Sequence, residues 1–202
     1  YPTEVAEEIC DRAHEAGLPV HLDGARIFNA SIALGKSVKE LTRKFDSVMF
    51  CLSKGLGAPV GSMLVGSREF IEKAFVHRKM LGGGMRQVGV LAAAGLIALE
   101  ETPNSLHRDH ENAKHLAIAL SKMPGISIDP QKVVTNILIF DVRQTGKTGA
   151  EISEDLKKRN VLANATDKSL VRMVTHYDVD RTKIGRAIAA MSEICAPERA
   201  HA

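Results

Sequence analysis

The sequence predicts an α/β fold, and three features of its first half support this prediction. Two apolar segments, LPVHLD at residues 18–23 and DSVMFCL at residues 46–52, have the length and composition of buried strands. A helical segment, ARIFNASIAL, lies between them and ends at Gly35, a residue type favoured just after a helix. Strands that alternate with helices and are apolar along their whole length indicate a sheet covered on both faces.

Helix boundaries around these strands follow from periodicity and caps. A first helix, ending near Gly17, is predicted by an apolar stripe: Val5, Ile9 and Ala13. Ser37 and Glu40 have the spacing of a capping box and predict a short helix to about Lys44. The first strand is therefore preceded by a helix, and the second follows two helices.

A third strand and two further helices complete the first part of the chain. GSMLVG at residues 61–66 is the strand, and a helix is expected from Ser67 to about Met80. After the LGGGMRQ break, residues 88–101 form a long helix that is apolar nearly all round, so we expect it to be buried. The composition changes at residues 102–105. We therefore expect residues 1–102 to be part of a large α/β domain and residues 103–202 to be a small C-terminal α+β domain.

The second part contains its own strands and helices. An amphipathic helix is marked by Ala113, Leu116, Ala117 and Leu120. Strands are expected at NILIFDV, VLANA and LVRMVT, and Thr148 with Glu151 forms a second capping box that opens a helix to Arg159. A closing helix carries Ile184, Ile188, Met191 and Cys195.

Composition narrows the functional classes. The 202 residues carry a net charge of only +3, and aromatic residues make up 4% without any Trp, so we expect no nucleic-acid partner. No apolar run has the roughly 18 residues of a membrane span. Three widely spaced cysteines predict a reducing, cytoplasmic location and show no metal-ligand spacing. Because the chain starts at Tyr1, without an initiator Met, we expect it to come from a longer polypeptide.

One lysine stands out in the stretch CLSKGLGAPVGS at residues 51–62. A predicted buried strand leads to Lys54, and Gly55, Gly57 and Gly61 allow backbone to approach a ligand closely. A desolvated lysine has a lowered pKa and can act as a neutral nucleophile in Schiff-base chemistry. The alternative is a loop lysine that lies in water at the end of a strand.

A second candidate residue lies upstream, in HLDGAR. Asp23 is placed at the carboxyl end of a strand, where ligands bind in open α/β sheets. Its carboxylate could be a metal ligand, a helix N-cap or the partner of a ring nitrogen. His21 is the one nearby residue that could add to a metal site, which disfavours metal. Asp23 and Lys54 together suggest pyridoxal phosphate, with the lysine on the aldehyde and the aspartate on the pyridine nitrogen.

Longer segments strengthen this suggestion. HLDGARIFNA, FDSVMFCLSKGLGAPVGSMLVG, RKMLGGGMRQ and LVRMVTHYDV occur in this order along the chain. They resemble the low-specificity L-threonine aldolase family of fold-type I pyridoxal-phosphate enzymes. The resemblance runs from about residue 1 to residue 195 and implies the C-terminal part of the large mixed-sheet domain, followed by the small α+β domain. A preceding segment that stacks on the cofactor and binds its phosphate has no counterpart here.

The resemblance also implies roles for individual residues. Lys54 would bind the cofactor aldehyde, Asp23 would pair with the pyridine nitrogen, and Arg26 would lie by the phenolate oxygen. Arg172 would bind the substrate carboxylate, a task suited to a planar bidentate donor. Each has an alternative, since Arg26 could be a surface helix residue and alternation between Val171 and Met173 could turn Arg172 outward into water.

Two more basic residues come from the glycine-rich segment. By the same resemblance, Arg86 and, more weakly, Lys79 would add positive charge near phosphate or substrate, across a subunit interface, although Arg86 could instead cap the following helix. His21 is expected beside the site or in the core rather than in catalysis. His176 is expected to be structural, with a place near the site as the alternative. No residue is assigned as the catalytic base, and no metal is expected.

The function implied by the resemblance is cleavage of L-threonine or L-allo-threonine to glycine and acetaldehyde, in threonine catabolism and glycine biosynthesis. It also implies a homotetramer, a dimer of dimers, acting on a small amino acid. The alternatives are another fold-type I enzyme, such as a β-eliminating lyase or an aminotransferase, and an inactive subunit without a complete cofactor site. We expect residues 1–202 to need an upstream segment for tight cofactor binding and turnover.

Overall fold

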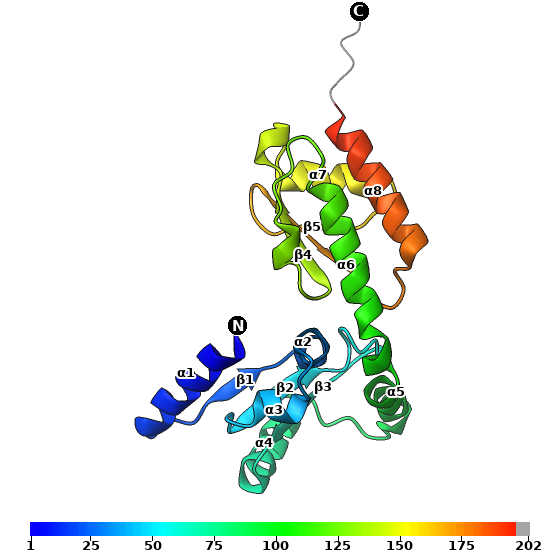
Figure 1. Cartoon of the computed structure of the whole chain (residues 1–202). Coiled ribbons are helices and arrows are strands. Elements are labelled where there is room, and N and C mark those ends of the chain that lie inside the picture. Colours follow the sequence, from blue (N-terminus) through cyan, green and yellow to red (C-terminus); the bar gives the residue numbers. More distant parts are fainter. Residues whose placement is uncertain (197–202) are drawn as a thin grey trace, which may run out of the picture. The chain divides into compact units, whose positions relative to one another are not determined.

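The structure is a computed structural model that describes residues 1–196 (Figure 1). Contacts between residues divide the chain into two compact units, Tyr1–Ser105 and the part from Leu106 onward. The sequence places a boundary between residues 102 and 103, and separate domains stay a prediction. Each unit is described by itself below.

The first unit contains a three-stranded mixed sheet. Strands β1 (His21–Asp23), β2 (Ser47–Cys51) and β3 (Ser62–Gly66) occur in the order β1-β2-β3. β1 and β2 are parallel, with Asp23 opposite Met49, whereas β2 and β3 are antiparallel. The three predicted strands are confirmed, although the first is shorter than the predicted 18–23. The parallel pair is what brings the carboxyl ends of β1 and β2 to one edge.

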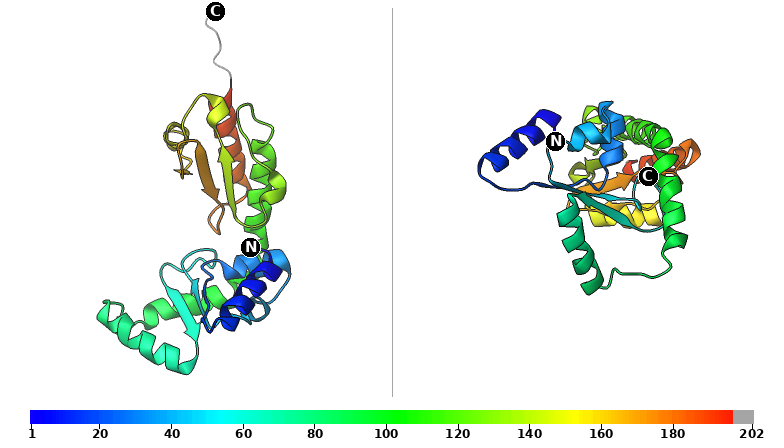
Figure 2. Two further views of the ribbon diagram at one scale, coloured as in Figure 1. Left: turned by 90° about the vertical axis from the view of Figure 1, so that its left-hand side faces the viewer. Right: turned by 90° about the horizontal axis from the view of Figure 1, so that it is seen from below.

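Five helices accompany this sheet among the described residues: α1 (Thr3–Glu15), α2 (Ile27–Leu34), α3 (Val38–Thr42), α4 (Arg68–Met80) and α5 (Gly89–Glu100). The predicted caps are confirmed, since Gly35 ends α2 with a φ of 62° and Ser37 and Glu40 form the capping box of α3. Helices α2 and α3 lie on one side of the sheet and α4 on the other (Figure 2). The helix that follows β1 is therefore next to the carboxyl edge of the sheet.

Four charge pairs join helix α1 to the rest of the unit. Three acidic residues of α1 pair with basic residues, and His14 pairs with an aspartate. The partners all come from the segment that connects α2 to β2, and the pairs are Glu4–Lys36, Glu7–Arg43, Asp11–Lys44 and His14–Asp46. Cys10 is the buried residue of this helix. The predicted stripe is correct as a helical pattern, but Val5 and Ile9 are 42% and 50% exposed.

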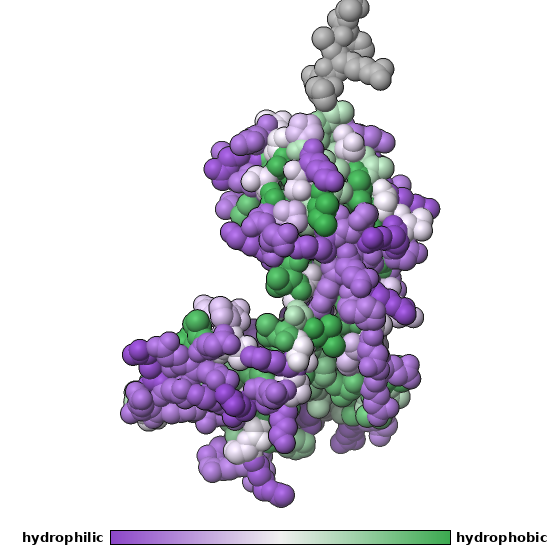
Figure 3. Space-filling model, viewed as in Figure 1, coloured by the Kyte–Doolittle hydropathy of each residue, from purple (hydrophilic) through white to green (hydrophobic). Residues whose placement is uncertain are grey.

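Two burial predictions for this unit are wrong. All five residues of β3 are exposed, so the sheet is not covered on both faces, and α5 exposes Val90, Leu96 and Ile97. Apolar side chains gather on the surface formed around α5 (Figure 3). Periodicity shows which side chains form an apolar face, whereas burial also needs an element that covers the face. The other elements of the first unit do not supply that cover for β3 or for most of α5.

The second unit is a small antiparallel sheet with helices on one face. Strands β4 (Ile137–Asp141), β5 (Asn164–Ala165) and β6 (Leu170–Val174) occur in the order β4-β6-β5. Helices α6 (Leu106–Leu120), α7 (Gly149–Lys157) and α8 (Arg181–Cys195) accompany them, with 3₁₀ turns η2 (Pro130–Lys132) and η3 (Arg143–Thr145) between them. A further 3₁₀ turn, η1 (Thr102–Ser105), ends the first unit. Helices α6 and α8 lie side by side against the sheet (Figures 1 and 2).

The core of this unit lies between the sheet and the three helices. It contains Leu138 and Phe140 of β4 and Val171 of β6, each at most 1% exposed. The four apolar residues predicted to face inward from α6 are buried, and the Thr148–Glu151 capping box is present. Of the closing-helix residues, Ile184, Met191 and Cys195 are buried. Every helix among residues 1–196 is too short or too polar to span a lipid bilayer.

Candidate functional site

The carboxyl edge of β1 and β2 carries two of the predicted site residues. Their pairing continues beyond the strands, because the Gly24 N–H donates to the Met49 carbonyl at 2.8 Å and the Cys51 N–H donates to the Ala25 carbonyl at 3.3 Å. The segments that hold Asp23 and Lys54 therefore leave the sheet from the same edge. In open α/β sheets this edge is where ligands bind.

A hydrogen-bonded turn presents Lys54. The Ala58 N–H donates to the Leu52 carbonyl and the Gly57 N–H donates to the Lys54 carbonyl, both at 3.0 Å. Gly57 has a φ of 77°, a conformation that residues with a side chain adopt at a cost. Leu56 and Ala58 are 3% and 7% exposed and anchor the turn in the protein. The turn is thus fixed on its inner side.

Lys54 itself is exposed. The expectation that it is a desolvated lysine is therefore wrong for the described residues. The physical reason is that β2 ends at Cys51, three residues earlier, so the chain has already left the buried part of the sheet when it reaches Lys54. What the turn provides is a lysine amine at the edge of the sheet with small residues beside it.

Asp23 is also exposed, and its role in the fold is local. Its Oδ1 accepts a hydrogen bond from the Ala25 N–H at 3.2 Å. The N-cap of α2 is Arg26, so Asp23 does not cap that helix. This excludes the helix-cap alternative and leaves most of the carboxylate's hydrogen-bonding capacity for another partner.

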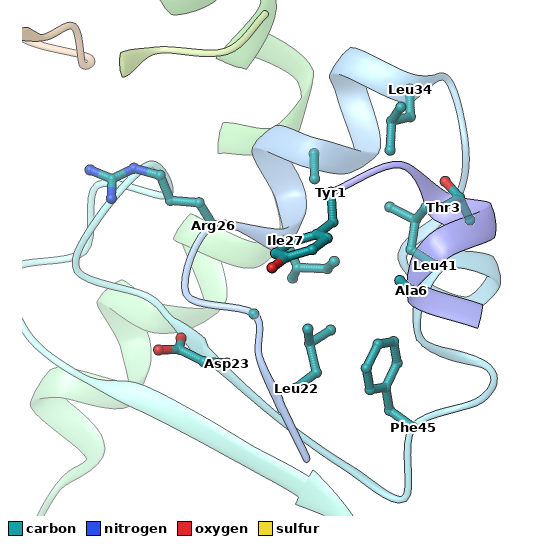
Figure 4. Close-up of a pocket in the computed structure, with 12 residues that line it drawn as sticks. Tyr1, Thr3, Ala6, Leu22, Asp23, Arg26, Ile27, Leu34, Leu41 and Phe45 are labelled. Atoms are coloured by element: carbon teal, nitrogen blue, oxygen red, sulfur yellow. The ribbon is translucent and has the colours of Figure 1, made fainter. Parts of the chain in front are cut away.

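Arg26 is half-buried at the junction between β1 and α2. The helix begins at Ile27, so Asp23 lies at the end of a strand and Arg26 at the N-cap of a helix. Both residues border a cavity of about 310 Å³ whose other lining includes Leu22 and Phe45. Figure 4 shows the Asp23 and Arg26 side chains directed away from these apolar side chains. The interior of the cavity is thus lined mainly by apolar side chains, and the carboxylate of Asp23 and the guanidinium of Arg26 lie at its border.

His21 does not belong to a cluster of residues that could bind a metal ion among residues 1–196. The His21 Nδ1 is 2.8 Å from the Ser47 hydroxyl on the neighbouring strand, and its side chain is exposed. Among residues 1–196, no group of three or more His, Cys, Asp or Glu residues is placed to hold a metal ion. His21 therefore has a contact within the sheet, in line with a supporting role.

Lys79 and Arg86 belong to the end of α4 and the loop after it. This glycine-rich loop folds back on the helix, since the Gly83 N–H donates to the Arg78 carbonyl at 2.8 Å. The aliphatic part of Lys79 lies over Gly84, where a side chain at position 84 would collide with it. Both basic residues are exposed, and the contacts described for residues 1–196 do not join either of them to Lys54.

Arg172 is in the second unit, on the central strand β6. Its neighbours Val171 and Met173 are 0% and 5% exposed and face the core, so Arg172 faces the opposite side of the sheet. There it pairs with Ile139, which is 49% exposed, and Asn164. The alternation between Val171 and Met173 is present, and Arg172 on the opposite face is half-buried. Its role in substrate binding stays a prediction. Arg172 and Lys54 lie in different units, so the structure describes each in its own surroundings.

A buried polar network fixes the end of β6. The Thr175 hydroxyl donates to the Asp109 carbonyl at 2.7 Å, and the Asn136 Nδ2 donates to the Thr175 carbonyl at 2.7 Å. Burial raises the pKa of the Asp109 carboxyl. His176, the next residue after this network, is exposed, and its Nδ1 is 3.5 Å from Asp178. The strand that carries Arg172 is therefore held in place through residues beyond its end.

Sequence reasoning missed one residue of this region. Asn29 on α2 is 1% exposed and lies against Gly55, next to Lys54. The signal was available, because Asn29 is a polar side chain inside the apolar run IFNASIAL. It carried no weight without knowledge of which side of α2 faces the turn.

Together, the fold and this edge define a class of protein, an α/β protein with a lysine and a carboxylate at the carboxyl ends of adjacent parallel strands. The chain belongs to the beta-eliminating lyase family, whose sequence model matches residues 1–144. It is 44% identical over 191 residues to low-specificity L-threonine aldolase 1 of Arabidopsis thaliana, and 46% identical over 188 residues to a low-specificity L-threonine aldolase of Escherichia coli O157:H7.

These alignments cover 94% and 93% of this chain but 53% and 54% of the relatives. The chain thus spans about half the length of the curated relatives it matches. A solved structure from Listeria monocytogenes, assigned as an L-allo-threonine aldolase, superposes with a TM-score of 0.75 at 21% identity and covers 93% of this chain and 55% of that one. This likeness shows the shared fold. Together with the family match, it gives the chain the fold class of the fold-type I pyridoxal-phosphate enzymes.

Proposed function

We propose that this chain contributes the cofactor lysine and the substrate carboxylate clamp of a pyridoxal-phosphate-dependent aldolase. The reaction is cleavage of L-threonine, L-allo-threonine and related β-hydroxy-α-amino acids to glycine and an aldehyde, which links the protein to threonine catabolism and glycine formation. The observation that carries the proposal is the common sheet edge from which Asp23 and the Lys54 turn emerge. The names of the Arabidopsis and Escherichia relatives support the substrate class.

The residues at this edge fit pyridoxal phosphate. Lys54 has an exposed amine, and Asp23 has an exposed carboxylate that does not cap α2. When bound, the cofactor supplies an electron sink for the electron pair of the Cα–Cβ bond that breaks. An aldehyde needs an amine nucleophile and a pyridine nitrogen needs an acidic partner, and both groups are present.

The chain's own residues then have distinct tasks. Lys54 would hold the cofactor through its side-chain amine, the group that reacts with an aldehyde. Asp23 keeps the ring nitrogen protonated, because an adjacent carboxylate favours the positively charged form. Arg26, at the N-cap of α2, would add positive charge beside the phenolate oxygen of the cofactor.

Substrate binding is assigned to basic residues. Arg172 binds the substrate carboxylate through two parallel N–H donors, a geometry that a lysine cannot reproduce. Arg172 lies on the face of the second sheet away from the core and is half-buried there. Arg86 and Lys79 add positive charge for the phosphate or the substrate.

The test is a labelling experiment followed by a product assay. Pyridoxal phosphate is added to the protein, borohydride reduces the imine, and peptide mapping locates the label; we expect it on Lys54. Label on another lysine instead would refute the assignment. Acetaldehyde release from threonine is then measured against keto-acid formation. Because the family is named for β-elimination, keto acid in place of acetaldehyde would favour that reaction over the aldol cleavage.

The assembly and location belong to the same proposal. We infer a homo-oligomer, a tetramer built as a dimer of dimers, in which polypeptide outside residues 1–202 completes the site; relatives of about twice this length support this. A cytoplasmic location is supported by three cysteines that are all free thiols and buried. Sedimentation of the cofactor-loaded protein, with and without that additional polypeptide, measures the assembly.

A further inference from the structure

The contact between Asn29 and Gly55 joins the two segments of the proposed site. Asn29 is on α2, the helix that follows Asp23 and Arg26, and Gly55 directly follows Lys54. A Cβ atom built on Gly55 would collide with the Asn29 Oδ1, and it would lie 3.1 Å from Cγ and 3.3 Å from Nδ2. The carboxamide therefore occupies the space that any side chain at position 55 would need.

The surroundings of this contact are buried. Asn29 is 1% exposed, and Leu56 on the other side of Gly55 is 3% exposed. The turn is thus anchored immediately after Lys54, while Lys54 itself is exposed. A shift of Asn29 would move the anchored peptide and, with it, the backbone from which the lysine projects.

The residue type at position 29 needs a reason. Asn is a poor helix former, and burying a carboxamide is unfavourable compared with burying an apolar side chain of the same size. The neighbours of Asn29 in the helix, Phe28 and Ala30, follow the apolar character of the segment. The carboxamide lies against Gly55, so a polar side chain buried at this position is placed to hold the turn.

We propose that Asn29 is a positioning residue that sets the place of Lys54 relative to Asp23, with Gly55 required as the small residue that receives its carboxamide. The inference rests on the proposed function, since it assigns Lys54 the task of binding an aldehyde. Asn29 acts through the Lys54–Gly55 peptide and does not touch the reacting atoms. It therefore belongs to the site in addition to Lys54, Asp23 and Arg26.

The first experiment compares Lys54 with a reference lysine in the same molecule. Pyridoxal phosphate is added to the 202-residue protein; an amine and the aldehyde form an imine with loss of water, and borohydride reduces it to a stable secondary amine. Mass spectrometry gives the ratio of label on Lys54 to label on Lys39, which is exposed on α3. In Asn29→Ala and in the similarly shaped Asn29→Leu we expect this ratio to fall about tenfold or more, since small misplacements of a reacting group are costly. An unchanged ratio in either folded variant overturns the proposal.

A double variant separates positioning from packing. Gly55→Ala should lower both the urea midpoint of unfolding and the labelling ratio, because the new methyl group meets the carboxamide. Adding Asn29→Ala removes that clash, so we expect the midpoint to recover while the ratio stays low. Recovery of both would show that Asn29 only fills space. Ser31→Ala is the matched control on α2, because Ser31 bonds to the Lys36 carbonyl at the far end of the helix and should leave the ratio unchanged.

Amide hydrogen exchange keeps this inference separate from the proposed function. If the wild-type protein shows no preference for Lys54, the assignment of Lys54 fails, but the positioning role is still measured at Gly57 and Ala58, whose N–H groups close the turn. We expect faster exchange at these two amides in Asn29→Ala and Asn29→Leu, with exchange in β2 and β3 unaffected. Exchange at the wild-type rate at both amides overturns the positioning role.

Discussion

Thr175→Val should destabilise the second unit by removing one buried hydrogen bond at the end of the strand that carries Arg172. Thr175 is 1% exposed, and its hydroxyl donates to the Asp109 carbonyl at 2.7 Å. Valine has nearly the same shape, so the substitution leaves packing almost intact and isolates the loss of the hydroxyl. The backbone of residue 175 keeps its bonds to Asn136.

The expected loss of free energy of unfolding depends on which hydrogen-bond donors remain for the Asp109 carbonyl in Thr175→Val. A hydrogen bond contributes about 0.5–1.5 kcal/mol net, and a buried group left without a partner costs about 1–3 kcal/mol. Because Asp109 lies in the first turn of α6, helical geometry gives its carbonyl a second donor four residues on. We therefore expect the free energy of unfolding to fall by about 1–2 kcal/mol. In a domain of 60–100 residues this corresponds to about 4–8 °C in Tm for each kcal/mol.

Urea unfolding of three variants measures this effect. Thr175→Ser keeps the hydroxyl and loses a methyl group, for which we expect about 0.8 kcal/mol. Thr166→Val, at an exposed position of the same unit, is the control and should stay within about 0.5 kcal/mol of wild type. If Thr175→Val is no less stable than Thr175→Ser, the buried hydroxyl does not hold the end of β6 and the reasoning fails.

Three further predictions concern the site and its support. Asp23→Asn should keep cofactor absorbance but lose most acetaldehyde production, because a neutral group no longer favours the protonated ring nitrogen; near-normal turnover would remove Asp23 from catalysis. Arg172→Lys should weaken amino-acid binding by about 1.5–3 kcal/mol through loss of the bidentate contact, measured as a raised KM with unchanged cofactor absorbance. The Val20 N–H and the His14 ring hold the pKa of Asp46 below its ordinary value. The stabilisation by Asp46 is therefore present above about pH 4 and is lost as the pH falls through the lowered pKa, so the stability gap between wild type and Asp46→Asn should close in acid.

Local chemistry made much of the fold predictable. Three predicted helix ends are confirmed: the capping boxes at Ser37 and Thr148 and the C-cap glycine of α2, Gly35. Each depends only on residues within about one turn of the helix end. Burial was less predictable, as β3 and α5 show, because it depends on which elements come to lie against an apolar face. A single sequence shows the face but does not show its cover.

The candidate site divides along the same lines. Placing Asp23 and Lys54 at one edge needed only the parallel pairing of two strands, which the strand–helix–strand order indicates. The exposure of Lys54 and the place of Asn29 depended on where β2 ends and on which side of α2 faces the turn. Both depend on how elements pack in the tertiary structure, which the pattern of residues in a single sequence does not show.

The four charge pairs that attach α1 give the N-terminal helix a particular sensitivity. Exposed ion pairs are screened by dissolved salt over a Debye length of about 8–10 Å, whereas contacts between apolar side chains are not weakened in this way. Glu4–Lys36 and His14–Asp46 are of this exposed kind, and the side chains of Val5 and Ile9 contribute little to attachment because they are themselves exposed. Raising the ionic strength should therefore loosen α1 while the sheet beside it stays folded, and protease cleavage between α1 and β1 should accelerate with salt. The attachment of the helix before the site therefore depends on ionic strength, whereas the folding of the sheet beside it does not.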